Sequence, residues 1–156
     1  MKQTRREINL IVVHCSATRE DRSYTPEQME RDHKARGFNS AGYNFYIRRS
    51  GEIISLRPLD QIPAHAKGYN RNSIGICYEG GLDSNGVARD TRTNAQRLAL
   101  ESLLKQLIAA YPDSKIVGHR DLSPDLNGNG IIEPNEWTKM CPCFDASVEY
   151  KHLSNE

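Results

Sequence analysis

Two histidines and one cysteine are the residues of this chain whose types and positions best suit a metal centre. His14 and His119 each follow a short apolar segment, so we expect each at the carboxyl end of a β-strand, where sheet proteins place ligands. Cys141 lies near the other end of the chain. Two imidazoles and one thiolate are a recognised ligand set for Zn²⁺ that leaves the fourth position to water. The residual charge of about +1 lowers the pKa of that water toward roughly 7, which suits hydrolysis.

Two other interpretations of these residues stay open. Cys141 could be a nucleophile activated by His119, whereas His14 and Cys15 cannot form such a pair because neighbouring strand residues point to opposite faces. A structural zinc site would need a fourth protein ligand, for which Cys143 is the candidate. A chelator separates the first alternative from the zinc enzyme, because it abolishes activity only where the metal is needed.

The elements that must position these residues follow from periodicity and capping signals. Thr25 and Thr93 each begin a capping box, and the helices that they open are expected to end at Gly37 and before Pro112. Apolar and β-branched runs predict five strands, at residues 8–14, 43–47, 52–56, 73–78 and 115–118. The second and third of these strands flank a turn at residues 48–51 and predict a hairpin.

This alternation predicts an α/β fold with a central mixed β-sheet flanked by helices. The length of 156 residues favours a single domain over residues 1–156. The last dozen residues are polar and are expected to form a frayed tail.

Six motifs occur in an order that resembles a known family: His14 to Thr18, Gly42 to Phe45, His65 to Asn70, Asn72 to Cys77, Gly118 to Arg120, and Lys139 to Pro142. Together they resemble the zinc-dependent N-acetylmuramoyl-L-alanine amidases of the phage-endolysin and peptidoglycan-recognition-protein family. The resemblance spans roughly residues 8 to 145. It implies the same mixed sheet and hydrolysis of the amide between the lactyl group of N-acetylmuramic acid and L-alanine of peptidoglycan.

The resemblance also assigns roles to individual residues. His14, His119 and Cys141 match the zinc ligands, and Tyr43 and Lys139 match the catalytic tyrosine and lysine. From its turn-rich segment, His65 is predicted to line the substrate groove, whereas His33 and His152 are interpreted as non-functional. The rival hypothesis is a non-catalytic peptidoglycan-binding protein of the same fold, and the presence of Cys141, Tyr43 and Lys139 favours catalysis.

An insertion at residues 125–136 departs from the phage pattern, in which few residues separate the second zinc histidine from the Lys-x-Cys segment. It matches the EF-hand calcium-loop pattern D-x-[DN]-x-[DN]-G-x5-E. The predicted calcium ligands are Asp125, Asn127, Asn129, Ile131 through its carbonyl, and Glu136. Few of these are charged, so we expect an affinity of about 10⁻⁴–10⁻³ M. We predict that Ca²⁺ rigidifies the insertion and thereby positions Lys139 and Cys141.

Charge and hydropathy exclude several classes of protein. The 21 Lys and Arg residues against 20 Asp and Glu residues give a formal net charge of +1, which argues against a nucleic-acid partner. No segment has the roughly 20 apolar residues of a membrane span, and the apolar run after the basic start is too short for a signal peptide. We expect a monomer that acts on the cell wall, either endolysin-like or exported with its leader removed.

Overall fold

The computed structural model describes residues 5–123, 126 and 140–153. Its main sheet has the strand order β4-β3-β5-β1-β7. These strands are β1 (Leu10–Cys15), β3 (Phe45–Ile47), β4 (Ile53–Ser55), β5 (Ser73–Tyr78) and β7 (Lys115–Gly118). β1 pairs in parallel with β5 and β7, β3 pairs in parallel with β5, and β4 pairs antiparallel with β3. The predicted mixed sheet and hairpin are therefore confirmed.

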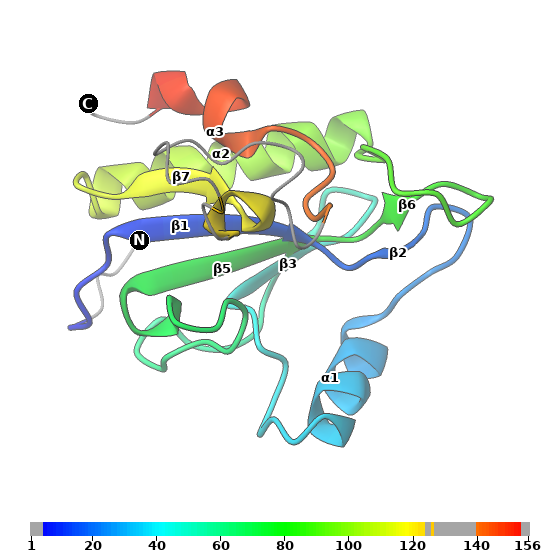
Figure 1. Ribbon diagram of the computed structural model, residues 1–156, viewed down its shortest axis with the longest axis horizontal. Helices are drawn as coiled ribbons and strands as arrows, with labels where there is room; N and C mark the ends of the chain where they lie inside the picture. The colour runs from blue at the N-terminus through cyan, green and yellow to red at the C-terminus, as the bar shows by residue number, and fades with distance from the viewer. Residues whose placement is uncertain (1–4, 124–125, 127–139, 154–156) are drawn as a thin grey trace.

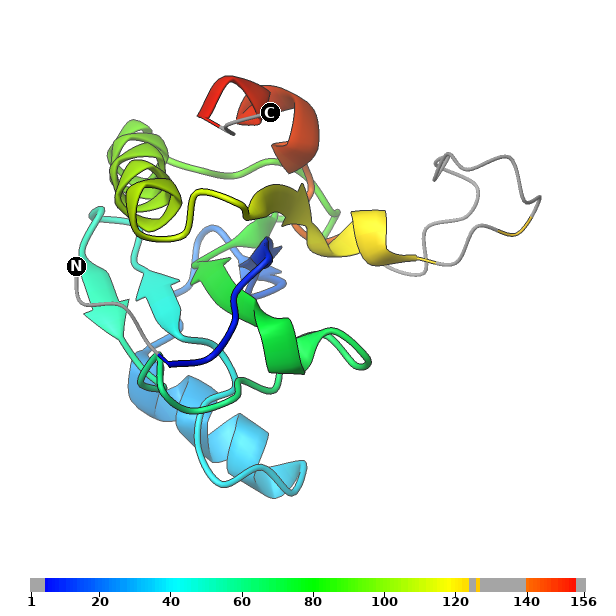
Figure 2. The same cartoon turned by 90° about the vertical axis from the view of Figure 1, so that its left-hand side faces the viewer.

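Helices lie on both sides of this sheet (Figures 1 and 2). α1 (Pro26–Ala35) lies on one side, and α2 (Asn94–Ala110) lies on the other with α3 (Ala146–Glu149) beside it. Both long helices begin at the predicted threonines, Thr25 and Thr93, each of which closes a capping box with a glutamine. The predicted α/β fold with a sheet between helices is confirmed.

The alternation of side chains along β1 divides the core between the two faces of the sheet. Ile11, Val13 and Cys15 belong to the large apolar cluster that contains the buried leucines of α2. His14 faces the other side, where its ring lies 5.0 Å from the ring of Tyr43. The same alternation that buries the core of β1 thus directs His14 toward the side of the sheet that α1 covers.

Two short strands and three 3-10 helices in the described part of the chain were not predicted. β2 (Thr18–Arg19) and β6 (Gly81–Leu82) form a separate two-stranded parallel sheet. Single-turn 3-10 helices lie at η1 (Asn70–Asn72), η2 (His119–Leu122) and η4 (Lys151–Leu153). None of the helices described is both long and apolar enough to cross a membrane.

The predicted frayed tail is wrong over residues 145–153, which are folded. Tyr150 is 3% exposed, and its hydroxyl accepts a hydrogen bond from Arg92 at 2.8 Å. The guanidinium of Arg92 also pairs with Glu149 at 2.8 Å and with Asp90 at 3.0 Å, and it lies 3.4 Å from the ring centre of Phe144. This buried arginine attaches the C-terminal segment to the chain that leads into α2.

Candidate metal centre and active site

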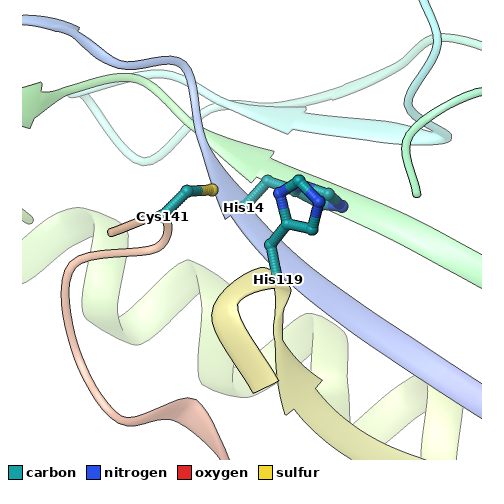
Figure 3. A group of neighbouring side chains, drawn as sticks. All are labelled: His14, His119 and Cys141. Carbon is teal, nitrogen blue, oxygen red and sulfur yellow. The ribbon is translucent and has the colours of Figure 1, made fainter. Parts of the chain in front are cut away.

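His14, His119 and Cys141 come together in space although they lie far apart in the sequence (Figure 3). One potential ligand atom from each residue lies within 4.8 Å of the other two. His14 is 1% exposed, and its ring centre lies 4.5 Å from that of His119. The structure thus assembles the three residues that the sequence analysis selected for a metal centre.

Parallel strand pairing explains why the two histidines meet. In the register between β1 and β7, Val13 lies opposite Gly118. The residue that follows each of them in the sequence is a histidine, so the two histidines lie at the same level of the sheet. His14 still belongs to β1, whereas His119 is the first residue of η2. The carboxyl ends of parallel strands share one edge, and both imidazoles are therefore brought to that edge.

Cys141 is held against this edge by contacts of its backbone and its sulfur. The N–H of Cys15 donates to the Cys141 Sγ at 3.1 Å, and the N–H of Arg120 donates to the Cys141 carbonyl at 2.9 Å. The buried Tyr78 hydroxyl donates to the carbonyl of Pro142 at 2.6 Å. These bonds attach the cysteine to β1, η2 and β5, and they place its sulfur beside the two histidines.

Gly118 makes room for the segment that carries Cys141. A Cβ atom at this glycine would lie 2.7 Å from the Cδ of Pro142, closer than real side chains approach one another. The ring of Pro142 therefore packs directly on the backbone at the end of β7. Close packing of this kind fixes the depth at which the neighbouring thiol lies.

The thiol of Cys143 makes its hydrogen bond away from the two histidines. It donates to the carbonyl of Gly81 at 3.4 Å, and it is not part of the group of metal-ligating side chains found among the described residues. Cys15, Cys77, Cys141 and Cys143 are all free cysteines. In the described part of the chain the donor set is therefore two imidazoles and one thiol, which fits Zn²⁺ with a position open for water or substrate.

Tyr43 belongs both to the core and to the site. Its side chain packs against the cluster of Met29, Tyr46 and Cys77, and its ring lies beside that of His14. Removal of the hydroxyl from water, with the nearby thiol of Cys77 as a second cause, raises the pKa of Tyr43 well above its usual value. The phenol is therefore protonated at neutral pH and can donate a hydrogen bond.

His65 contacts the site through its ring. Its Nδ1 lies 2.7 Å from the Nε2 of His14, and its Nε2 lies 2.8 Å from the Oγ of Ser73. Burial, with the nearby His119 as the next cause, lowers the pKa of His65 to about 3. The imidazole is therefore neutral near pH 7.

A cavity of about 320 Å³ opens over the three candidate ligands. His65 and Tyr43 both line this cavity. Its other wall comes largely from α1 and the chain on either side of that helix, with Tyr24, Asp32, His33, Arg36 and Phe38.

His33, interpreted as non-functional from the sequence, belongs to this wall of the cavity. Its Nδ1 accepts a hydrogen bond from the N–H of Gly42 at 2.8 Å, and its ring centre lies 5.6 Å from that of Tyr43. The sequence offered no signal for this wall, because the polar side chains of α1 are those of any helix with one exposed face.

Several predicted site residues lie outside the described residues. They are Lys139 and the predicted calcium ligands Asp125, Asn127, Asn129, Ile131 and Glu136. The catalytic role of Lys139 and the calcium loop therefore stay predictions from the sequence.

Comparisons with known proteins agree with the geometry. Residues 4–142 match the family described as N-acetylmuramoyl-L-alanine amidase. The endolysin of Klebsiella phage KP32 is 36% identical over 141 residues, which cover 90% of this chain and 84% of the relative. An uncharacterized protein of Haemophilus influenzae is 50% identical over 95 residues, covering 61% of this chain and 82% of the relative.

Solved structures of similar fold include both amidases and recognition proteins. The N-acetylmuramoyl-L-alanine amidase LysC from Clostridium intestinale superposes with a TM-score of 0.68 at 27% identity, covering 94% of this chain and 85% of the other. Wild-type Drosophila PGRP-LB superposes with a TM-score of 0.69 at 23% identity, covering 96% of this chain and 83% of the other, and this likeness shows the fold alone.

Proposed function

The chain belongs to the N-acetylmuramoyl-L-alanine amidase family, and from this premise we propose that it is a zinc-dependent peptidoglycan amidase. The bond cleaved is the amide between the lactyl group of N-acetylmuramic acid and L-alanine of the stem peptide. The observation that carries the proposal is the meeting of His14, His119 and Cys141 at the base of an open cavity. We propose these three residues as the metal ligands.

The donor set supports zinc and an open coordination position. Zn²⁺ held by two imidazoles and a thiolate supplies Lewis-acid activation of water near neutral pH. The protein contributes the orientation of the ligands: His14 is fixed within β1, and Cys141 is fixed by the N–H of Cys15. A site held this firmly needs little rearrangement when substrate arrives.

Tyr43 and Lys139 are the proposed catalytic groups of the chain. The phenol of Tyr43 is protonated and lines the cavity, so it can donate a hydrogen bond to the oxygen of the scissile carbonyl. In an extended segment Lys139 would face the same side as Cys141, two residues later, which would bring an ammonium group toward the developing negative charge. Removal of either group is expected to reduce turnover more than substrate binding.

The proposed substrate enters across the wall that α1 provides. Asp32 and Arg36 place opposite charges on that wall, which can meet the amide and carboxylate groups of a short peptide. Several sequence relatives are named endolysins, which supports an action on the bacterial cell wall. We propose the same site of action for this chain.

Hydrolysis of purified peptidoglycan tests the proposal. Wild-type protein is expected to release new L-alanine amino termini, and both a chelator and Cys141→Ser are expected to abolish this release. Zinc added after the chelator should restore the wild type alone. Cys143→Ser is the matched control, because its thiol contacts Gly81 and lies outside the ligand group.

The other outcomes identify the competing hypotheses. Binding of peptidoglycan without any release of amino termini would establish the non-catalytic alternative. Hydrolysis that resists the chelator but is lost in Cys141→Ser would establish a cysteine nucleophile. Loss of zinc in Cys143→Ser would indicate a closed structural site.

A further inference from the structure

The imidazole of His14 makes a second short contact, on the side that faces His65. The Nε2 of His14 lies 2.7 Å from the Nδ1 of His65. Two nitrogens that bind one tetrahedral Zn²⁺ at about 2.0–2.1 Å each would lie about 3.3 Å apart, so this pair is too close to share a metal ion. The two nitrogens instead share a proton, which leaves the Nδ1 of His14 as the nitrogen available to a metal.

The contact continues into the sheet through a buried serine. The Nε2 of His65 lies 2.8 Å from the Oγ of Ser73, which is fully buried at the start of β5. A neutral imidazole has one donor and one acceptor nitrogen. If the Nε2 of His14 donates to the Nδ1 of His65, the Nε2 of His65 must donate to Ser73. The two contacts then form one series of hydrogen bonds from His14 through His65 to Ser73.

The surroundings of His65 hold its ring in one place. The Oδ1 of Asn70 accepts from the N–H groups of both His65 and Ala66 at 2.9 Å, which fixes the backbone. Beneath the ring lies Gly75, where a Cβ atom would come within 2.7 Å of the His65 Cγ. Any larger residue at position 75 would displace the imidazole, so the sheet itself provides the space for this ring.

We propose that His65 is a positioning residue that fixes the ring orientation and tautomer of His14, so that His14 presents its Nδ1 to the metal. Histidines that bind metals generally donate their second N–H to an acceptor that orients the ring and increases its basicity. Both ring nitrogens of His65 take part in this role, one toward His14 and the other toward Ser73. This inference rests on the proposed metal centre.

Zinc affinity, measured by competition with a chromophoric chelator, tests the inference without any activity assay. His65→Ala removes the acceptor and is expected to weaken zinc binding by about 10–100-fold. His65→Asn places an amide oxygen near the position of the lost Nδ1 and is expected to recover most of the affinity. Lys67→Ala, an exposed residue of the same loop, is the matched control and should bind zinc as the wild type does.

A spectroscopic measurement tests the tautomer directly. In the zinc-loaded wild type, nitrogen NMR of the imidazoles should show a metal-bound Nδ1 and a protonated Nε2 in His14. Circular dichroism of each zinc-free variant identifies any that has failed to fold, and His65→Asn then carries the comparison. A metal-bound Nε2 in His14 would overturn the inference, as would equal zinc affinity in wild type and a folded His65→Ala.

Failure of the inference can be distinguished from failure of the proposed function. If the wild type cleaves peptidoglycan in a zinc-dependent manner while His65→Ala keeps full zinc affinity, the function stands and the role of His65 falls. If the wild type binds zinc and His65→Ala binds it weakly, but no amide is cleaved, the role of His65 stands and the amidase proposal falls. A wild type that binds no zinc overturns both.

Discussion

Replacement of Tyr78 by phenylalanine tests whether the Cys141 segment is held in position by the sheet beneath it. Tyr78 is fully buried in β5, and its hydroxyl donates to the carbonyl of Pro142 at 2.6 Å. Phenylalanine keeps the ring, which lies 6.2 Å from the ring centre of Phe144, and removes the hydroxyl alone. The substitution therefore removes one buried hydrogen bond next to a proposed metal ligand.

The expected cost follows from the carbonyl that loses its donor. A buried acceptor left without a partner costs about 1–3 kcal/mol. A loss of about 2 kcal/mol corresponds to a fall in Tm of roughly 4–8 °C for a chain of this size. Since 1.4 kcal/mol is a factor of ten in affinity, a full loss of about 2 kcal/mol in the positioning of Cys141 would weaken zinc binding by about thirtyfold.

Tyr46→Phe is the matched control for this experiment. Its hydroxyl also donates to a backbone carbonyl at 2.7 Å, but this carbonyl belongs to Tyr24 and not to the segment of Cys141. Urea unfolding of the zinc-free proteins should show a similar loss of stability in both variants, whereas chelator competition should show weaker zinc binding in Tyr78→Phe alone. Unchanged zinc affinity in a destabilised Tyr78→Phe would refute the reasoning.

Three further predictions concern stability and calcium. Glu79 is buried, and although burial alone would raise its pKa, hydrogen bonds from Arg48 and from backbone N–H groups lower that pKa below 4.5. The contribution of Glu79 to the free energy of unfolding is therefore complete above about pH 4.5 and is lost as the pH falls through the lower, folded-state pKa. In Glu79→Gln, the free energy of unfolding should fall less steeply with decreasing pH on the acid side than in the wild type. An equally steep fall in the two proteins would contradict this role of the carboxylate. Arg92→Ala should lower the free energy of unfolding, measured by urea titration, by about 2 kcal/mol. This loss is smaller than the loss expected when a fully buried ion pair is broken, because Glu149 is partly exposed. A loss below about 0.5 kcal/mol would count against a stabilising role of this ion pair. Calcium at millimolar concentration should raise the Tm of the zinc-loaded protein if residues 125–136 bind it, and Glu136→Gln should remove the shift; no shift in the wild type would reject the predicted loop.

Local sequence signals predicted most of the secondary structure. Thr25 and Thr93 begin helices because their hydroxyls accept from a backbone N–H three residues later, and this chemistry depends only on neighbouring residues. The strands were recognisable for a similar reason, since apolar residues that face a core repeat at short intervals. The order of the strands in the sheet and the faces that the helices cover needed the tertiary structure.

The C-terminal segment shows where local signals were insufficient. Residues 145–153 form the one-turn helix α3 and the 3-10 helix η4. Their core residues Ala146, Tyr150 and Leu153 follow the helical spacing i, i+4 and i+7, but this run is shorter than the window over which such a repeat identifies a helix. Their order depends on Tyr150 and Glu149, which meet Arg92 across a separation of nearly sixty residues in the chain. A contact of that kind is invisible to any short window of sequence.

The candidate metal centre divides in the same way between sequence and tertiary structure. The sequence alone determined which residues could bind zinc, because two strand-end histidines and a cysteine are recognisable by chemical type and by the resemblance of the surrounding motifs. Their convergence was decided by the tertiary structure: the parallel pairing of β1 with β7 brings His14 and His119 to one level, and backbone hydrogen bonds then bring Cys141 to them. The support of His14 by His65 and the wall provided by α1 depend on packing between distant segments, because side-chain orientation is set by tertiary neighbours and not by adjacent residues.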